Sequence, residues 1–326
     1  MRILIALGGN AILRRGESMT VANQIANIRR AAAQIARLAP DNQLIVTHGN
    51  GPQVGLLALQ AAAGGADGGT PLDVLDAESE GMIGYLLEQE LANVLPPGRP
   101  VATLLTRVEV QADDPAFAHP TKPIGPVYAK SEAERFAVLN HWTIAPDGAG
   151  YRRVVASPKP QRISELMPIR WLVELDTIVI AAGGGGVPVS ITADGTTRMG
   201  VEAVIDKDRC SALLAADVDA DMLVIATDVD AVYLDWHTPR ERALEEISAA
   251  KLKTMVFPAG SMGPKVEAAC EFALRTGQPA VIGSLEHIVE MVNGTAGTRV
   301  TVGPAVGVEP FHDERGAPHV AQASVG

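Results

Sequence analysis

The feature that most constrains the fold is a series of short apolar runs, rich in Ile, Leu and Val, that alternate with segments of helical periodicity. The runs lie at residues 3–7, 44–47, 101–106, 177–182, 223–227 and 280–283. Continuous apolar runs of this length suit strands that are buried on both faces of a sheet. Between the first two runs, one helical stripe contains Val21, Ile25, Ile28, Ala32, Ile35 and Leu38. A second stripe, over residues 266–274, is followed by Gly277 as a helix stop signal. The alternation predicts an α/β fold with a mainly parallel central sheet.

Four of the predicted strands end in loops of unusual composition. These loops are Gly8-Gly9-Asn10, His48-Gly49-Asn50-Gly51-Pro52, the four glycines at 183–186, and Asp228-Val229-Asp230. In open α/β sheets the ligand crevice lies outside the carboxyl ends of the strands. Glycine-rich loops that lead into helices can cradle phosphate oxygens with backbone N–H groups. A single loop of this kind could be only a tight turn, but several at one sheet edge favour a phosphate-binding site.

Charge and cysteine content narrow the function classes. The chain has 27 Lys and Arg against 38 Asp and Glu, a net charge of -11, which disfavours nucleic-acid binding. Cys210 and Cys270 lie in apolar segments without Cys-x-x-Cys spacing, which favours packing residues in a reduced, cytoplasmic protein. Glycines, prolines and polar residues interrupt the longest uncharged stretches, so no membrane span is expected.

Familiar catalytic motifs are absent from the sequence. The segment GSMGPK at 260–265 has the wrong spacing for a Walker A loop and lacks its hydroxyl residue. The segment GNGPQVG at 49–55 places its third glycine one position too late for a dinucleotide-binding fingerprint. The seven histidines form no zinc motif, and no Gly-x-Ser-x-Gly elbow is present. No protein-held metal site is therefore predicted.

Three lysines stand where a solvated surface lysine would be unusual. Lys122 lies between prolines, Lys207 lies between Asp206 and Asp208, and Lys265 follows a glycine-containing loop. Phosphoryl transfer needs cations placed around the phosphate oxygens, and lysine is a compact charge for this purpose. These three lysines are candidates for that role.

The Asp206-Lys207-Asp208 segment has two interpretations. In the first, Asp208 caps the helix that follows and forms a local ion pair. In the second, the two aspartates orient lysines and help to hold magnesium. The spacing favours neither. Asp228 similarly suits either a nucleotide pocket or a simple turn.

Residues 113–170 interrupt the alternation with many prolines, and we interpret them as an inserted subdomain or lid. The main domain is predicted at 1–303 and a C-terminal tail at 304–326.

Many segments in the same order resemble those of the carbamate kinases, within the amino acid kinase superfamily. The matching segments are ALGGNA at 6–11, THGNGPQVG at 47–55, GMIGY at 81–85, PTKPIGP at 120–126, RRVV at 152–155, SPKP at 157–160, GGGG with VP at 183–188, GVEAVIDKD at 200–208, TDVD at 227–230 and GSMGPK at 260–265. The resemblance covers nearly the whole chain. Glu80 stands where members of this family often carry glutamine.

The resemblance implies an open αβα sandwich, a homodimer, and reversible phosphoryl transfer between ATP and carbamate to give ADP and carbamoyl phosphate. Magnesium would enter with the nucleotide, and the reaction would commonly run toward ATP. Related kinases of the superfamily carry a lysine on the first strand, which this chain lacks; the carbamate kinase pattern supplies Lys122 instead.

The resemblance also assigns the site residues. Lys122, Lys207 and Lys265 would act on the phosphoryl group and the nucleotide phosphates, with Asp208 organising the lysines. The residues expected at the carbamoyl or phosphate end are Gly8, Gly9, Asn10, Gly49, Asn50 and Gly51. Those expected to border the nucleotide are Asp206, Asp228, Tyr233, Met262 and Gly263.

Two alternatives remain open at this point. One is a different kinase of the superfamily, acting on an acyl acid or a nucleoside monophosphate. The other is a protein that binds nucleotide or carbamoyl phosphate without turnover.

Overall fold

The central element of the computed structural model is an eight-stranded sheet with the order β15-β17-β16-β12-β1-β2-β9-β3. The structure describes residues 1–14, 16–63, 70–192, 194–258 and 260–303, so the predicted tail at 304–326 lies outside the described residues. The strands of this sheet are β1 (Arg2–Leu7), β2 (Gln43–His48), β3 (Val101–Leu104), β9 (Ile178–Ala181), β12 (Met222–Thr227), β15 (Glu246–Ser248), β16 (Ala280–Ser284) and β17 (Thr298–Thr301). Only the β16–β17 pair is antiparallel. All six predicted apolar runs form strands of this sheet, so the prediction of a mainly parallel α/β fold is confirmed.

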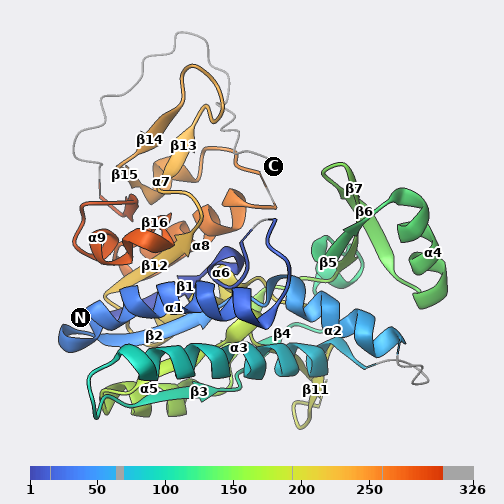
Figure 1. Ribbon diagram of the computed structural model, residues 1–326, viewed down its shortest axis with the longest axis horizontal. Helices are drawn as coiled ribbons and strands as arrows, with labels where there is room; N and C mark the ends of the chain where they lie inside the picture. The colour runs from blue at the N-terminus through green and yellow to red at the C-terminus, as the bar shows by residue number, and fades with distance from the viewer. Residues whose placement is uncertain (15, 64–69, 193, 259, 304–326) are drawn as a thin grey trace.

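Helices cover both faces of the sheet, giving three layers (Figure 1). One layer contains α1 (Val21–Leu38), α3 (Leu72–Val94) and α9 (Ile288–Val292), and the other contains α5 (Leu166–Glu174), α6 (Lys207–Asp217) and α8 (Met262–Thr276). Alternate residues of β1 pack into different layers: Ile3 and Ile5 face α1, whereas Leu4 faces the opposite side. This two-sided burial explains why residues 3–7 of the strand are all apolar.

The ends of α1 and α8 are capped, and the stop predicted at Gly277 is confirmed. Thr20 precedes α1, and its side chain accepts a hydrogen bond from the Asn23 amide, as an N-cap residue does. Gly277 ends α8 in the left-handed conformation, with φ of 76°.

A small antiparallel sheet, β5-β7-β6, forms with α4 a unit beside the main sandwich, at the right of Figure 1. Its elements are β5 (Lys122–Tyr128), α4 (Lys130–Asn140), β6 (Thr143–Asp147) and β7 (Gly150–Val155). They lie within the segment 113–170 predicted as an insertion, whereas α5, at the end of that segment, packs against β9 of the main sheet.

Two glycines allow this unit to approach the main sandwich. Helix α2 (Gly51–Ala63) packs against β5, and a Cβ atom added to Gly55 would lie 2.0 Å from the Cα of Gly125. Any larger residue at Gly55 would therefore push the two elements apart. This close approach fixes the position of β5, whose first residue is Lys122.

The described residues form two further sheets and a short helix. A four-stranded sheet, β11-β10-β4-β8, consists of β4 (Arg107–Val110), β8 (Pro160–Ile163), β10 (Val187–Ile191) and β11 (Arg198–Gly200). A hairpin is formed by β13 (Val232–Leu234) and β14 (Arg242–Leu244). A short helix, α7 (Ala249–Leu252), follows β15. Among the helices of the described ranges, none is long and apolar enough to cross a membrane.

Candidate active site

The four loops singled out in the sequence follow four strands that are neighbours in the sheet, in the order β12-β1-β2-β9. Because these strands are parallel, their carboxyl ends meet at one edge. The Gly8 amide donates to the Ala226 carbonyl over 2.8 Å, and the Gly49 amide donates to the Leu7 carbonyl over 3.1 Å. The loops are thus held side by side at the edge where open α/β sheets bind ligands.

Helix α6 points its first turn at this edge, and the residue that caps it is Asp206. The Asp206 carboxylate accepts hydrogen bonds from the amides of Asp208 and Arg209, at 3.0 and 3.3 Å. The interpretation of Asp208 as the cap is therefore wrong: the helix begins at Lys207, two residues earlier than a cap at Asp208 would require. Asp208 is left to interact through its side chain.

Each of the three lysines contacts one of the two aspartates. Lys122 Nζ lies 2.6 Å from Asp206 Oδ2. Lys207 Nζ lies 2.5 Å from Asp208 Oδ1, and Lys265 Nζ lies 3.1 Å from Asp208 Oδ2. Residues that come from β5, α6 and α8 thus form one cluster, which we call the lysine–aspartate cluster.

Because the cluster is buried, the pKa of each group depends strongly on its charged neighbours. Asp208 is 3% exposed, and burial alone would raise its pKa, but Lys207 and Lys265 outweigh this and hold the pKa well below its usual range. For Lys207 burial is the larger effect, and its pKa is lowered despite Asp208. For Lys265 the attraction of Asp208 prevails over burial and raises the pKa. Three ammonium groups facing two buried carboxylates leave an excess of positive charge for an anion.

The glycine loop after β2 lies directly on this cluster. A Cβ atom added to Gly49 would lie 3.2 Å from Lys207 Cδ and 3.5 Å from the Gly9 amide nitrogen. Gly9 and Asn10 belong to a short 3-10 helix, Gly9–Ala11, and Gly51 begins α2. The structure therefore brings the predicted substrate-binding backbone and the lysines to one place.

The residues predicted to border the nucleotide come from several elements. Met262 and Gly263 begin α8, the helix that carries Lys265, and the Gly263 amide donates to the Pro258 carbonyl over 2.9 Å. Asp228 helps to raise the pKa of Lys265 and so lies within its electrostatic reach. Tyr233 belongs to the β13–β14 hairpin, where its hydroxyl donates to Asp230 over 2.7 Å and its ring packs against Trp236.

Sequence reasoning missed the buried polar residues of α3 that support the β2 loop. Asn50 Nδ2 donates to Asp76 Oδ1 over 2.9 Å, and Asp76 and Ser79 are 2% and 0% exposed. The sequence pattern could have revealed them. Positions 72, 75, 76, 79, 80 and 83 form one helical stripe, in which Asp76, Ser79 and Glu80 are flanked by apolar residues. Polar residues on a core-facing stripe indicate a buried hydrogen-bond network.

Glu80 connects this helix to the glycine loop after β9 and to the short connection between β3 and β4. Its carboxyl oxygens accept from the Gly183 amide at 2.9 Å and the Thr106 amide at 3.2 Å. Burial raises the pKa of Glu80 to about 8, and the two backbone N–H groups offset only part of this effect. We therefore expect Glu80 to be mainly protonated in the folded protein at neutral pH.

This proton predicts a stability change with pH that Glu80→Gln removes. The folded-state pKa of about 8 lies above the ordinary 4.5, so between these values the folded protein binds more protons than the unfolded chain. Its free energy of unfolding should fall as pH rises through this window, by at most about 1.4 kcal/mol per pH unit. Denaturant unfolding at several pH values should show a steeper fall for the wild type than for Glu80→Gln. Parallel curves would show that Glu80 is ionised when folded.

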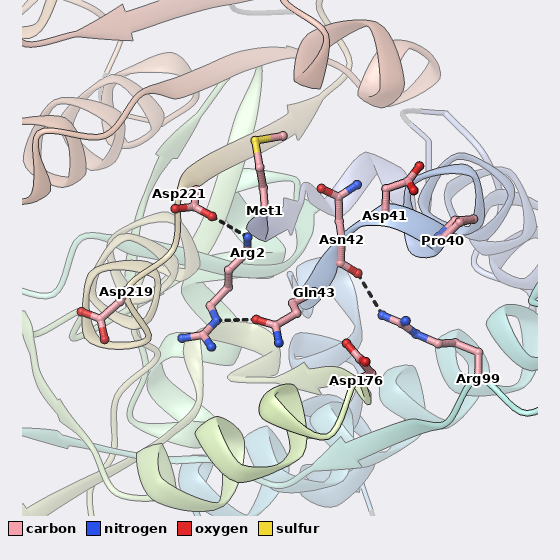
Figure 2. Close-up of a pocket in the computed structure, with 10 residues that line it drawn as sticks. All are labelled: Met1, Arg2, Pro40, Asp41, Asn42, Gln43, Arg99, Asp176, Asp219 and Asp221. Carbon is pink, nitrogen blue, oxygen red and sulfur yellow. Dashed lines mark hydrogen bonds between the residues drawn. The ribbon is translucent and has the colours of Figure 1, made fainter.

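A separate pocket of about 440 Å³ lies at the opposite edge of the sheet, where β1 and β2 begin (Figure 2). Arg2 crosses it, with Nε donating to Gln43 Oε1 over 3.1 Å, and the Arg2 amide donates to Asp221 over 2.7 Å. Because the amino ends of the strands border this pocket, it is distinct from the site of the glycine loops. Among the described residues, no group of three or more His, Cys, Asp or Glu side chains is placed to hold a metal ion.

Comparisons with known proteins agree with this geometry. The model of the amino acid kinase family matches residues 1–284. Carbamate kinase of Haemophilus influenzae is 58% identical over 301 residues, which cover 92% of this chain and 97% of the relative. Carbamate kinase of Thermococcus kodakarensis is 46% identical over 312 residues, covering 92% of this chain and 98% of the relative.

Among solved structures, carbamate kinase from Giardia lamblia bound to AMP-PNP superimposes with a TM-score of 0.83 at 39% identity. The match covers 92% of this chain and 98% of that one. The sequence motifs, the fold and these similarities lead to one conclusion: the chain belongs to the carbamate kinases of the amino acid kinase family.

Proposed function

We propose that the protein catalyses reversible phosphoryl transfer between ATP and carbamate, giving ADP and carbamoyl phosphate, and that it serves mainly to make ATP. The observation that carries this proposal is the lysine–aspartate cluster at the carboxyl ends of four adjacent strands. A cluster with excess positive charge beside glycine loops suits a group that is transferred as a phosphoryl anion.

The reaction needs little covalent help from the protein. In the forward direction a carbamate oxygen attacks the γ-phosphorus of ATP, the bond from that phosphorus to the β,γ-bridging oxygen breaks, and ADP leaves with the electron pair. Carbamate is already anionic, so no proton has to be removed from the attacking oxygen. The protein's task is to align two anions and to offset their charge.

We assign this task to the three lysines. Lys207 and Lys265 are proposed to contact the transferred phosphoryl group and the nucleotide phosphates, because Asp208 holds both ammonium groups in one place. Lys122 is proposed to approach from the β5 unit, and its ammonium group donates to Asp206 at the start of α6. Gly8, Gly9, Asn10, Gly49, Asn50 and Gly51 are proposed to surround the carbamoyl end.

Magnesium is proposed to arrive on the nucleotide rather than in a site of the protein's own. Both oxygens of Asp206 and both oxygens of Asp208 already accept hydrogen bonds, so these carboxylates do not form an open ligand pair. When bound to the phosphates, the cation would neutralise part of their charge. Asp206, Asp228, Tyr233, Met262 and Gly263 are proposed to border this nucleotide.

A coupled assay for ATP made from carbamoyl phosphate and Mg-ADP tests the proposal. We expect rapid ATP formation that depends on both substrates. Binding of ADP with no phosphoryl exchange at high protein concentration would contradict the proposal and indicate a protein that only binds its ligands.

We also propose that the protein is a homodimer and that it works in the cytoplasm. Helix α5, which packs against β9 next to the edge strand β3, exposes with its C-cap residue a stripe of apolar side chains: Met167 is 53% exposed, Trp171 58% and Leu175 74%. Helix α3 lies on the other face of the sheet against β3 (Figure 1). Its Tyr85 is 62% exposed. Apolar side chains gathered in this way are typical of a protein interface.

Substitution of Trp171 by glutamate is expected to shift the protein from dimer toward monomer, because it places a charge in the centre of the proposed interface. Light scattering during size-exclusion chromatography gives the mass, which should fall from twice 34.1 kDa toward 34.1 kDa. Val138→Glu is the matched control, since Val138 is 79% exposed on α4 of the β5 unit. A monomeric wild type would contradict the proposed dimer, and a Trp171→Glu variant that stays dimeric would place the interface elsewhere.

The division of the chain into a main domain, residues 1–303, and a lid within it is also a proposal. We propose that residues 113–170 include a lid, formed by the β5 unit, that brings Lys122 to the substrate. A cross-link that holds this unit away from the main sandwich should leave ADP binding intact and stop turnover.

A further inference from the structure

Asn50 lies on the loop beside Lys207, and the hydrogen bonds of its side chain restrict what it can offer a ligand. The residue is 6% exposed. A carboxamide has two N–H donors and one carbonyl acceptor. Asn50 Nδ2 donates to Asp76 Oδ1 over 2.9 Å and also lies 3.4 Å from Ser79 Oγ as a second acceptor. Within the described ranges no donor is hydrogen-bonded to Asn50 Oδ1, so this carbonyl oxygen is the side-chain atom left for a ligand.

The orientation of the carboxamide is set by Ser79 and by the glycine loop. The Ser79 hydroxyl donates its hydrogen to the Asp76 main-chain carbonyl over 2.9 Å, so Ser79 Oγ can only accept from Asn50. A carboxamide turned by 180° would place its oxygen against this acceptor. On the other side lies Gly184, where an added Cβ atom would be 2.6 Å from Asn50 Nδ2. The side chain is thus packed against backbone and has little room to rotate.

Asp76 supplies the main acceptor for the Asn50 carboxamide, and its burial suits that role. It is 2% exposed, and burial, followed by the neighbouring Glu80, raises its pKa well above the usual range. A neutral carboxyl group keeps a carbonyl oxygen that accepts from Asn50. The groups that face Asp76 are Asn50 and Ser79, and the titratable groups near it are Glu80, Asp73 and Glu202.

We propose that Asn50 Oδ1 accepts a hydrogen bond from the amino group of carbamate or carbamoyl phosphate, and that Asp76 and Ser79 are positioning residues that turn the carboxamide for this contact. The inference rests on the proposed function and deepens it by naming the substrate group that is recognised. The amino group is the hydrogen-bond donor of the carbamoyl end, whereas an acetyl group of the same shape has a methyl group there. A site with a buried acceptor discriminates strongly against a substrate that leaves the acceptor unpaired.

The test compares carbamoyl phosphate with acetyl phosphate, each as phosphoryl donor to Mg-ADP and each as competitor of the other. The variants are Asp76→Leu, Asn50→Ala and the conservative Asp76→Asn, which retains a carbonyl oxygen for Asn50. We expect the wild-type preference for carbamoyl phosphate, as the ratio of kcat/KM values or of inhibition constants, to fall roughly tenfold in Asp76→Leu and Asn50→Ala. In Asp76→Asn it should stay within about threefold of the wild type.

The possible failures are distinguishable. Equal losses for both donors in Asn50→Ala, with the ratio unchanged, would overturn the inference and leave the proposed function standing; this variant decides the matter if Asp76→Leu does not fold. A loss of preference in Asp76→Asn as large as in Asp76→Leu would reject the positioning role of Asp76. A wild-type protein that forms no ATP from either donor would instead overturn the proposed function.

Discussion

Exchange of Lys207 for methionine is expected to lower kcat for ATP formation by roughly 1,000-fold, the scale of losing one well-placed charge at a transition state. Methionine keeps most of the stem that packs beneath Gly49 but removes the ammonium group. Because Lys265 still pairs with Asp208, the fold should change little. The loss should therefore appear in the chemical step rather than in the protein's stability.

Steady-state kinetics with Mg-ADP and carbamoyl phosphate measures this effect, with circular dichroism to verify folding. Lys159→Met is the matched control, because it removes a lysine that is 57% exposed in its side chain and paired with Glu271 at the surface. A Lys207→Met protein with a kcat within tenfold of the control would show that Lys207 does not contact the phosphoryl group.

Exchange of Asp208 for asparagine is expected to have the second large effect, on both activity and stability. Asp208 is the shared partner of Lys207 and Lys265, so its neutralisation leaves two buried ammonium groups without their carboxylate. Removal of one partner from a buried ion pair costs about 3 to 5 kcal/mol of unfolding free energy, and the amide should keep the cost near the lower figure. Denaturant unfolding measures this loss.

The same substitution should move the pH dependence of activity toward acid. Burial lowers the pKa of Lys207, and the attraction of Asp208 opposes this effect. Without the carboxylate the pKa falls further, so a smaller fraction of Lys207 is charged at a given pH, and activity should recover as pH decreases. A pH–rate profile that coincides in shape with the wild type would show that the charge of Lys207 does not depend on Asp208.

Six strands of the sheet could be predicted from the sequence because each contains a short apolar run and helical stripes separate the runs. Residues 3–7 of β1 pack alternately into the two layers, so no polar residue interrupts this run. The β5 unit is different: β5 contains Pro123 and Pro126 and lies half exposed, so its sequence resembles a loop. Its antiparallel pairing with β7 depends on contacts that no local pattern encodes.

The residue types of the candidate site could be predicted from the sequence, but which of them form ion pairs or helix caps could not. Glycine loops at strand ends and lysines in confined positions indicated phosphate chemistry. The pairing of Lys122 with Asp206 depends on the close approach of Gly55 and Gly125, which are distant in sequence. The cap at Asp206 instead of Asp208 depends on where the first turn of α6 begins, and helix boundaries are the least certain part of a sequence prediction.

The buried polar residues of α3 were missed for a related reason. Asp76, Ser79 and Glu80 occupy positions that the helical period assigns to the core, where polar side chains are expected only with partners. Those partners, Asn50, Gly183 and Thr106, come from three other loops and are brought together only by the sheet. Conversely, the polar stripe itself indicates that such partners must exist.

The central claim is that the lysine–aspartate cluster transfers a phosphoryl group between carbamoyl phosphate and ADP. The most direct measurement is the rate of ATP formation from these two substrates by the wild type and by Lys265→Ala, prepared in parallel so that a contaminating kinase would be detected in both. The account predicts rapid ATP formation by the wild type and almost none by the variant, with ADP still bound. Equal rates in the two proteins, or no ATP from a wild type that binds ADP, would contradict it.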